Sequence, residues 1–286
     1  MSLGFVDIYE VGPRDGLQNE QADISVAQKI ALVDCLSRAG FSRIEVASFV
    51  SPKWVPQMSG SADVMAGITR NAGIRYAALT PNKKGFAQAR EAKADEVAIF
   101  ASASEGFSKA NVNATIAESL ERFEPILEGA RHIDLPVRGY ISCVVECPYD
   151  GAVAPSDVAK LADKLFAMGC YEISLGDTIG AGTPDTIARM LLAVREAVPA
   201  GRLAGHYHDT NGRAIDNIDA SLSLGLRTFD AAVGGLGGCP FAPGAAGNVA
   251  TEKVAAHLAA LGYETGLDLE VLQEAAEMAR AMRSPA

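Results

Sequence analysis

Two histidines lie two residues apart at the end of one short apolar segment. Residues 202–208 read Arg-Leu-Ala-Gly-His-Tyr-His, and His206 and His208 are two of only four histidines in the chain. Because alternate residues of a strand point to the same face, the two imidazoles would project together. Imidazole pairs in this arrangement are common metal ligands. The pattern favours a metal site over a buried core histidine, whereas His132 and His257 fall in helical stretches and are expected to be structural.

An arginine and an aspartate follow the first apolar segment of the chain, where residues 12–16 read Gly-Pro-Arg-Asp-Gly. A loop Arg-Asp pair is usually a surface ion pair, but at the end of a buried strand it can serve chemistry. Asp15 together with His206 and His208 would form a two-histidine, one-carboxylate site, with Asn248 as a further oxygen donor. Such ligands without a thiolate suit Mg²⁺ or Mn²⁺, and Zn²⁺, Co²⁺ or Fe²⁺ could also bind. Sites of this kind keep positions open for water or substrate.

A third segment combines glycines with a cysteine. Residues 234–244 read Gly-Gly-Leu-Gly-Gly-Cys-Pro-Phe-Ala-Pro-Gly. Four glycines in five positions predict a mobile loop, or backbone with positive φ. A plain flexible loop or a phosphate cradle would fit as well, but an exposed Cys239 thiol on such a loop could serve as an acid or a nucleophile. The remaining cysteines lie in or beside predicted helices and strands and are expected in the core: Cys35, Cys143, Cys147 and Cys170.

Short β-rich segments alternate with longer helical ones along the whole chain. Eight consecutive βα units predict a parallel sheet closed into a (β/α)₈ TIM barrel over about residues 4–262. The alternative is an open doubly wound sheet, which would need a G-x-G-x-x-G turn after the first strand. Residues 11–16 read Val-Gly-Pro-Arg-Asp-Gly instead. The eight predicted strands are 5–11, 43–49, 74–79, 96–101, 137–145, 171–176, 202–208 and 227–233.

Helix boundaries carry their own signals. Ser25 suits the first position of a helix cap, and Pro155 and Thr183 open two further helices. Gly40 and Gly169 suit helix C-terminal ends. A last helix over about 267–283 follows the eighth unit and should pack outside the barrel, so the chain 1–286 is expected to be a single catalytic domain with an additional C-terminal helix.

The bulk composition excludes several classes of protein. The net charge is −10 at pH 7, which argues against a nucleic-acid surface because phosphate binding needs clustered Lys and Arg. No apolar run approaches the roughly 20 residues of a membrane span, and the first residues lack the pattern of a secretory signal. An odd number of cysteines in a chain of this length is not a disulfide framework. We expect a reduced, cytoplasmic protein without nucleic-acid or membrane partners.

Taken together, these segments resemble 3-hydroxy-3-methylglutaryl-CoA lyases, within the barrel metallolyases named for a shared D-R-E signature. The Gly-Gly-Leu-Gly-Gly-Cys-Pro stretch is the most specific of them, whereas Gly-Pro-Arg-Asp-Gly and His-x-His occur across the wider group. The matching stretches span nearly the whole chain in the family's order: 11–20, 44–58, 173–184, 205–212 and 234–252.

The resemblance implies a role for each matching residue. Arg14, Asp15 and Glu45 match the signature, and Cys239 matches the cysteine of a mobile active-site loop. The divalent-metal ligands (Mg²⁺ or Mn²⁺) would be Asp15, His206, His208 and Asn248. Positions at or near the acyl pocket, or supporting it, are matched by Gln18, Ser48, Tyr140, Asp177, Thr178 and Glu252.

The chain departs from the family in three places. Ala231-Ala232 stand where serines usually lead into the glycine loop, Phe241 follows Cys-Pro in place of tyrosine, and Gln21 replaces a common lysine. The departures leave the chemistry intact but affect loop packing and the contacts with the CoA phosphates.

The implied reaction is a metal-dependent retro-Claisen cleavage of 3-hydroxy-3-methylglutaryl-CoA to acetyl-CoA and acetoacetate, with leucine degradation and ketone-body formation as the expected context. His206 or Asp15 would remove the hydroxyl proton; the sequence does not choose between them. Arg14 would stabilise the thioester enolate, Glu45 would orient Arg14 or a ligand, and Cys239 would protonate the carbanion. The resemblance also implies an acyl-CoA substrate and a homo-oligomer (dimer or higher).

Three other functions remain as alternatives. A Claisen-type acyl-CoA synthase shares the metal site but usually carries further C-terminal domains. A related barrel metallo-aldolase would not need the Cys239 loop. A non-enzymatic barrel scaffold is disfavoured by the intact set of Arg14, Asp15, His206, His208 and Cys239.

Overall fold

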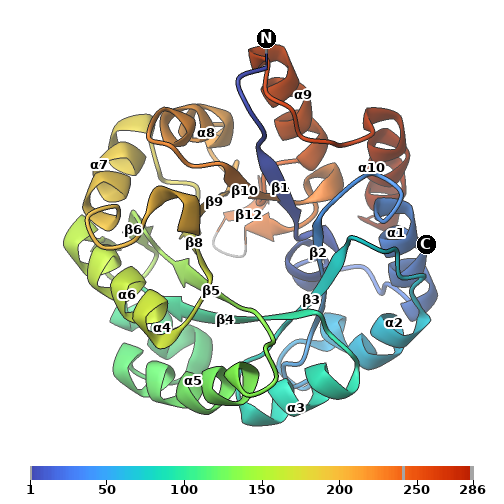
Figure 1. The fold of residues 1–286 in the computed structure, drawn as a ribbon, viewed down its shortest axis with the longest axis horizontal. Coiled ribbons are helices and arrows are strands. Elements are labelled where there is room, and N and C mark those ends of the chain that lie inside the picture. The colour runs from blue at the N-terminus through green and yellow to red at the C-terminus, as the bar shows by residue number, and fades with distance from the viewer. Residues whose placement is uncertain (1, 240–241, 284–286) are drawn as a thin grey trace.

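Eight parallel strands form a closed barrel (Figure 1). The structure, a computed structural model, describes residues 2–239 and 242–283, and the side chains of all of these except 238–239 and 242–245. Around the barrel the order is β1-β10-β9-β8-β5-β4-β3-β2. This confirms the predicted TIM barrel and excludes the open sheet. The strands are β1 (Asp7–Glu10), β2 (Arg43–Ser48), β3 (Arg75–Leu79), β4 (Glu96–Ser102), β5 (Val137–Ser142), β8 (Glu172–Asp177), β9 (Leu203–Tyr207) and β10 (Thr228–Ala231).

Helices form a ring around the barrel (Figure 1). Ser25 caps the first of them with a complete capping box, as predicted, and Thr183 does the same for another. Gly169 ends a third helix with a left-handed φ of 113°. The helices of the ring are α1 (Val26–Leu36), α2 (Ser61–Gly67), α3 (Lys83–Glu91), α4 (Glu105–Val112), α5 (Ile116–Arg131), α6 (Pro155–Met168), α7 (Pro184–Val194), α8 (Ala214–Ser223) and α9 (Thr251–Leu261).

Several predicted elements were longer than the observed ones, and the ends of α1 and β5 differ most clearly. Helix α1 ends at Leu36, and Gly40 lies in the turn that follows, with a φ of 94°. Strand β5 ends at Ser142, not at residue 145, because Cys143 takes a left-handed φ of 62° that breaks the extended backbone. Cys143 and Cys147 therefore do not share a strand, although both are buried, as are Cys35 and Cys170.

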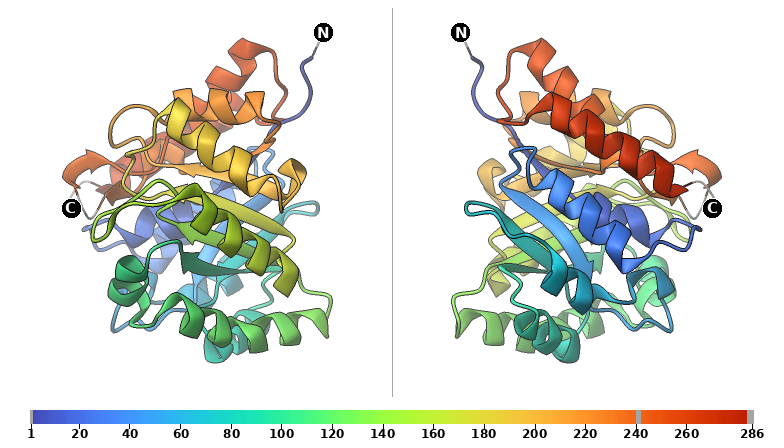
Figure 2. Two further views of the ribbon diagram at one scale, coloured as in Figure 1. Left: turned by 90° about the vertical axis from the view of Figure 1, so that its left-hand side faces the viewer. Right: turned by 90° about the vertical axis from the view of Figure 1, so that its right-hand side faces the viewer.

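The last helix, α10 (Leu269–Arg283), lies outside the barrel, as predicted. It packs against α1 and α9, and Figure 2 shows it running beside α1. Its buried face consists largely of alanines, which lets the helix approach its neighbours closely. No helix among the described residues is long and apolar enough to cross a membrane.

The barrel opens at the carboxyl-terminal ends of its strands, and we call this end the mouth. Short turns follow the strands there. A π-helical turn, η1 (Gly12–Gly16), follows β1, and a 3₁₀ turn, η4 (Val233–Gly235), follows β10. Other 3₁₀ turns are η2 (Pro56–Met58) and η3 (Ala200–Arg202). Two small antiparallel hairpins complete the fold: β6 (Glu146–Cys147) with β7 (Gly151–Ala152), and β11 (Gly238–Cys239) with β12 (Ala242–Ala246).

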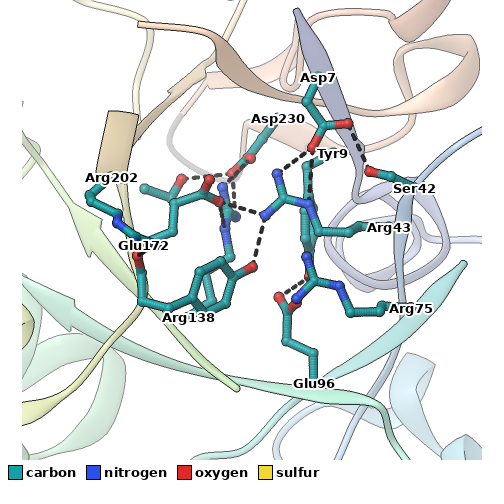
Figure 3. Close-up of polar contacts among 12 residues, drawn as sticks. Asp7, Tyr9, Ser42, Arg43, Arg75, Glu96, Arg138, Glu172, Arg202 and Asp230 are labelled. Atoms are coloured by element: carbon teal, nitrogen blue, oxygen red, sulfur yellow. Dashed lines mark hydrogen bonds and ion pairs between the residues drawn. The ribbon is translucent and has the colours of Figure 1, made fainter. Parts of the chain in front are cut away.

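The barrel strands carry charged residues that are buried. Their side chains have no water to bind, so each must find a partner within the protein. Figure 3 shows how several of them are joined in one network of ion pairs and hydrogen bonds. The buried charged residues of the barrel strands are Glu10, Arg43, Glu45, Glu96, Arg138, Glu172, Asp177, His206 and Asp230.

Candidate active site

The four residues predicted to bind a metal meet at the mouth of the barrel. Asp15 lies in η1, His206 in β9 and His208 one residue beyond it, and one ligand atom of each lies within 4.8 Å of the others. Asn248 forms an antiparallel bridge with His208, and its Nδ2 donates a hydrogen bond to Asp15 Oδ2 at 2.8 Å. We call these four residues the ligand group.

The protonation states of Asp15 and His208 suit a cation. Burial alone would raise the pKa of the Asp15 carboxyl, but Arg14 and His206 lower it to about 2. Burial, together with the neighbouring His206, lowers the pKa of His208 to about 4. The carboxylate is therefore ionised and the His208 imidazole neutral at pH 7, which are the forms that bind metal. The Nδ1 atom of His208 is buried with no hydrogen-bond partner among the described residues, so the mouth offers an unused polar atom beside the ligand group.

Asp230 holds the His206 ring on the side away from Asp15. Its Nδ1 atom lies 3.1 Å from Asp230 Oδ2, while its Nε2 atom lies 3.9 Å from Asp15 Oδ2. Burial alone would lower the pKa of His206, but the hydrogen bond with Asp230 and the charges of Asp230 and Asp15 raise it. One nitrogen of the ring is thus occupied and the other faces the ligand group.

Arg14 lies next to the ligand group and is almost completely buried. Its Nε donates to Glu45 Oε2 at 2.6 Å, and its Nη1 donates to Asp15 Oδ1 at 2.7 Å. The Tyr140 hydroxyl also donates to Glu45 Oε2, at 3.1 Å, and the Tyr140 ring lies 5.5 Å from the guanidinium. Burial would lower the pKa of Arg14, but the Glu45 and Asp15 carboxylates hold it above its usual value. Arg14, Asp15 and Glu45, predicted as one signature, are one hydrogen-bonded cluster.

Three further polar atoms at the mouth are buried and find no hydrogen-bond partner within the part of the chain that the structure describes. They are Gln18 Oε1, Glu45 Oε1 and Ser48 Oγ. A buried polar atom left unsatisfied costs free energy, and each such atom calls for an explanation. A bound polar ligand would supply the missing partners.

Asp177 and Thr178 are used differently from Gln18 and Ser48. The two Asp177 oxygens accept hydrogen bonds from the backbone N–H groups of Ala181 (3.1 Å) and Gly182 (2.8 Å). Thr178 Oγ1 accepts one from the Cys143 N–H group at 2.8 Å. Within the described residues these two side chains thus hold the loop after β8 and are not hydrogen-bonded to the ligand group. Burial raises the pKa of Asp177 to about 6.

Carboxylates hold the beginning of the glycine segment. Glu252 Oε2 accepts a hydrogen bond from the Gly234 N–H group at 3.0 Å, and Glu20 Oε1 accepts one from Gly237 at 2.9 Å. Gly237 has a φ of 94°, and a Cβ there would lie 3.1 Å from Asn248 Nδ2 and 3.2 Å from Gly16 Cα. Glycine is therefore required where the segment passes η1. Glu252 thus holds this segment, and among the described residues it forms no hydrogen bond with the ligand group.

Cys239 lies in the short ladder between β11 and β12, paired with Ala242. Its thiol lies outside the described residues, as does Phe241. Its predicted role therefore stays a prediction.

Sequence reasoning missed four buried or half-buried residues that support the site. Their common signal is a charged residue inside an apolar strand or beside the signature turn. Because a barrel strand is buried on both sides, such a charge must be paired in the interior. The four are Glu10, Glu20, Arg138 and Asp230.

Comparisons with known proteins agree with this geometry. The HMGL-like family model matches residues 5–279. The chain is 58% identical over 272 residues to a 3-hydroxy-3-isohexenylglutaryl-CoA/hydroxy-methylglutaryl-CoA lyase of Pseudomonas aeruginosa, covering 95% of this chain and 91% of that protein. A solved HMG-CoA lyase of Brucella melitensis is 60% identical with a TM-score of 0.97, covering 98% of this chain and 99% of the other.

A third relative was solved with ligands. It is an HMG-CoA lyase of Acinetobacter baumannii in complex with coenzyme A and 3-methylmalate, 37% identical with a TM-score of 0.93. The match covers 98% of this chain and 92% of that one. The chain belongs to the HMGL-like family.

Proposed function

We propose that this protein is a metal-dependent lyase that cleaves 3-hydroxy-3-methylglutaryl-CoA to acetyl-CoA and acetoacetate. The observation that carries the proposal is the contact between Arg14 and the ligand group: an enolate-stabilising cation lies beside the site for a divalent metal, at the end of a barrel where catalysis takes place. Membership of a family whose close relatives are named for this activity supports it.

The ligand group would hold the metal through Asp15, His206, His208 and Asn248. The Asn248 amide nitrogen faces Asp15, which leaves its carbonyl oxygen as the ligand atom. The donor set of oxygen and imidazole nitrogen suits Mg²⁺ or Mn²⁺. A divalent cation bound there supplies Lewis acidity toward the substrate oxygens.

Arg14 stabilises the enolate. Its Nε and Nη2 pair with Glu45 and its Nη1 with Asp15, so one N–H on each terminal nitrogen stays free for the thioester oxygen. The guanidinium is fixed in advance, and a preorganised donor of this kind stabilises negative charge without reorganisation. Glu45, which also accepts the Tyr140 hydroxyl, sets the plane of the guanidinium.

The proton balance needs a base and an acid. The substrate hydroxyl loses its proton to His206 or Asp15, its C–O bond becomes a carbonyl, and the adjacent carbon–carbon bond breaks. The electron pair of that bond passes to the thioester enolate, which takes a proton on carbon from the Cys239 thiol. Gln18 and Ser48, whose buried oxygens lack partners, bind polar groups of the acyl chain. Asp177 and Thr178 act indirectly, by holding the loop after β8 beside this pocket.

A coupled assay for acetyl-CoA and acetoacetate tests the activity. Equimolar products from 3-hydroxy-3-methylglutaryl-CoA are expected. The isohexenyl homologue belongs in the same assay because the Pseudomonas aeruginosa relative is named for both substrates. Cleavage of free hydroxy-keto acids but not of the acyl-CoA would favour the aldolase, and acyl-CoA condensation without cleavage would favour the synthase. Absence of any turnover in folded, metal-loaded protein would support a scaffold.

Cys239→Ser tests the acid. A positioned proton donor contributes typically about 10² to 10⁴-fold, so kcat should fall on that scale while the variant still folds and binds metal. Cys170→Ala, at a buried cysteine far from the mouth, is the matched control and should keep its rate. Alkylating agents should label Cys239 first, and bound acyl-CoA should slow the labelling. A wild-type rate in the Ser variant would contradict the assigned role.

The remaining assignments are proposals of the same kind. We infer that residues 1–286 act as one catalytic domain, as a homo-oligomer in the cytoplasm, with an acyl-CoA substrate and in leucine degradation or ketone-body formation. Gel filtration with light scattering measures the mass in solution. The mass of a monomer would contradict the proposed homo-oligomer.

A further inference from the structure

We propose that Asp230 is a positioning residue that fixes the orientation of His206, and that Arg138 and Ser174 hold Asp230 for this purpose. The inference rests on the proposed function only in treating His206 as a metal ligand. None of the three supporting side chains contacts the other ligands through a hydrogen bond among the described residues.

Asp230 connects β10 to its neighbours across the barrel interior. Its Oδ2 atom lies 3.1 Å from His206 Nδ1 and accepts a hydrogen bond from Ser174 Oγ at 2.7 Å. Both of its oxygens accept from Arg138, Oδ1 from Nη2 at 2.7 Å and Oδ2 from Nη1 at 3.0 Å. Three neighbours therefore fix one carboxylate. Figure 3 shows the pairing of Asp230 with Arg138.

Arg138 has little freedom of its own. It is fully buried, and its guanidinium lies 4.2 Å from the centre of the Tyr9 ring and 4.9 Å from that of Tyr140. Its Nε donates to Glu172 Oε1 at 2.7 Å. A planar cation held by two rings and two carboxylates presents its fork in one direction, which a lysine could not reproduce. The rigidity of Arg138 thus passes to Asp230.

The arrangement selects one tautomer of His206. A carboxylate in a two-pronged pair with arginine has no proton to donate, so the hydrogen bond to Asp230 requires the proton on His206 Nδ1. Nε2 then carries the lone pair, and it faces Asp15 Oδ2 at 3.9 Å, too far for a hydrogen bond between them. Loss of a carboxylate that hydrogen-bonds the far nitrogen of a ligating histidine weakens metal affinity about 10 to 100-fold.

His208 provides an internal comparison. It lies on the same strand face, but its Nδ1 atom has no hydrogen-bond partner in residues 2–237 and 246–283, whose side chains the structure describes. The barrel therefore orients only one of the two imidazoles by a carboxylate.

The test measures Mn²⁺ binding alone, by isothermal titration calorimetry or by electron paramagnetic resonance of free Mn²⁺. Asp230→Asn keeps the size of the side chain but can present its amide N–H₂ to His206. We expect the Kd for Mn²⁺ to rise about 10 to 100-fold. Ser174→Ala, which removes one hydrogen bond from Asp230 and leaves the carboxylate in place, should change it far less.

A second background separates positioning from general stability. In His206→Ala protein, Asp230→Asn should cause no further loss of Mn²⁺ affinity, because the residue through which it acts is gone. An equal loss in both backgrounds would show a merely structural role and overturn the proposal. An unchanged Kd in folded Asp230→Asn would overturn it as well.

A measurement on the unsubstituted protein covers the case in which Asp230→Asn does not fold. In ¹⁵N-histidine-labelled, metal-free protein, the signals lost in His206→Ala identify His206. They should show a protonated Nδ1 and an unprotonated Nε2; the opposite tautomer would overturn the proposal. If Mn²⁺ binding behaves as expected but acyl-CoA is not cleaved, the proposed function fails and the positioning role stands.

Discussion

The two ends of the barrel interior treat buried polar groups in opposite ways. At the amino-terminal end, Arg43 donates to Glu172 Oε1 at 2.8 Å and to Asp7 Oδ2 at 3.0 Å. The Tyr9 hydroxyl donates to Glu96 Oε1 at 3.0 Å, and Glu96 Oε2, which accepts no hydrogen bond from the described residues, lies 3.4 Å from Arg75 Nη1 in an ion pair. At the mouth, four polar atoms in residues 18, 45, 48 and 208 are buried with no hydrogen-bond partner among the described residues.

The difference separates stability from binding. For a buried ion pair, the attraction between the two charges offsets the free energy of removing them from water. Removing one partner leaves the other charge buried and uncompensated. A buried polar atom without a partner in the protein is a cost that a bound ligand or an ordered water offsets. Substitutions at the amino-terminal end should therefore act first on unfolding, and those at the mouth first on binding and catalysis.

The largest expected effect is loss of the metal. Chelation should abolish cleavage, and Mg²⁺ or Mn²⁺ should restore it. His208→Ala should weaken metal affinity by about 100-fold or more, above the range of roughly 10 to 100-fold for residues behind the ligands. His132→Ala, at an exposed helix end, is the control and should bind normally. Full activity in metal-free buffer would contradict the mouth as a metal site.

Glu172→Gln tests the opposite end. Glu172 lies between Arg43 and Arg138, whose charges overcome the effect of burial and lower its pKa. Removing this charge should cost about 3 kcal/mol of unfolding free energy, as for one partner of a buried ion pair. Ser48→Ala, which removes a mouth hydroxyl without a hydrogen-bond partner, should leave the denaturant midpoint nearly unchanged and raise KM. A large loss of unfolding free energy in Ser48→Ala, together with an unchanged denaturant midpoint in Glu172→Gln, would contradict the assignment of stability to one end and binding to the other.

Arg14→Lys should have the next largest effect. The variant keeps the positive charge but loses the two-pronged donor. We expect kcat to fall about 10²-fold or more, the scale for losing one preorganised oxyanion donor, with a smaller change in KM. Arg38→Lys, at an exposed position in the turn after α1, is the control. If kcat is kept and KM alone rises, Arg14 is a binding residue and not a catalytic one.

Local patterns in the sequence were sufficient for the barrel and the ligand group. Strand and helix periods predicted eight βα units, and the spacing of His206 and His208 placed two imidazoles on one face. Asp15 followed because the carboxyl ends of parallel strands meet at the same end of a barrel. These inferences need only the period of a strand and the direction of its neighbours.

The supporting contacts were beyond such patterns. Arg138 and Asp230 are 92 residues apart in sequence, and each alone reads as an irregular position in a buried strand. Their pairing depends on which barrel strands face each other across the interior. The backbone partners of Asp177 could not be predicted either, because a carboxylate that accepts backbone N–H groups a few residues later looks, in sequence, like any polar loop residue. Charged residues within several strands were the available signal.

Glu10 supplies the smallest and most selective test. It lies at the mouth, yet it is fully bonded: its Oε1 accepts from the Gly12 (2.7 Å) and Val233 (2.9 Å) N–H groups, and its Oε2 from Thr251 Oγ1 (2.7 Å). Unlike Glu172, it has no cationic partner among the described residues. Burial therefore raises its pKa to about 7, although these hydrogen bonds act in the opposite direction.

Because this folded-state pKa lies above the unfolded value of 4.5, the unfolded chain releases the proton first as pH rises. Stability is therefore highest below the unfolded pKa and is lost progressively until the pH passes about 7. Relative to Glu10→Gln, which does not titrate, the wild-type protein should lose about 1.5 kcal/mol between pH 5.5 and pH 7. Denaturant titrations of both proteins at each pH measure this, with the exposed Glu121→Gln as the control. If wild type and Glu10→Gln show the same pH dependence, the Glu10 carboxyl is paired with a cation or hydrated in solution. Water would then reach the mouth, and the buried polar atoms there could be bonded to water.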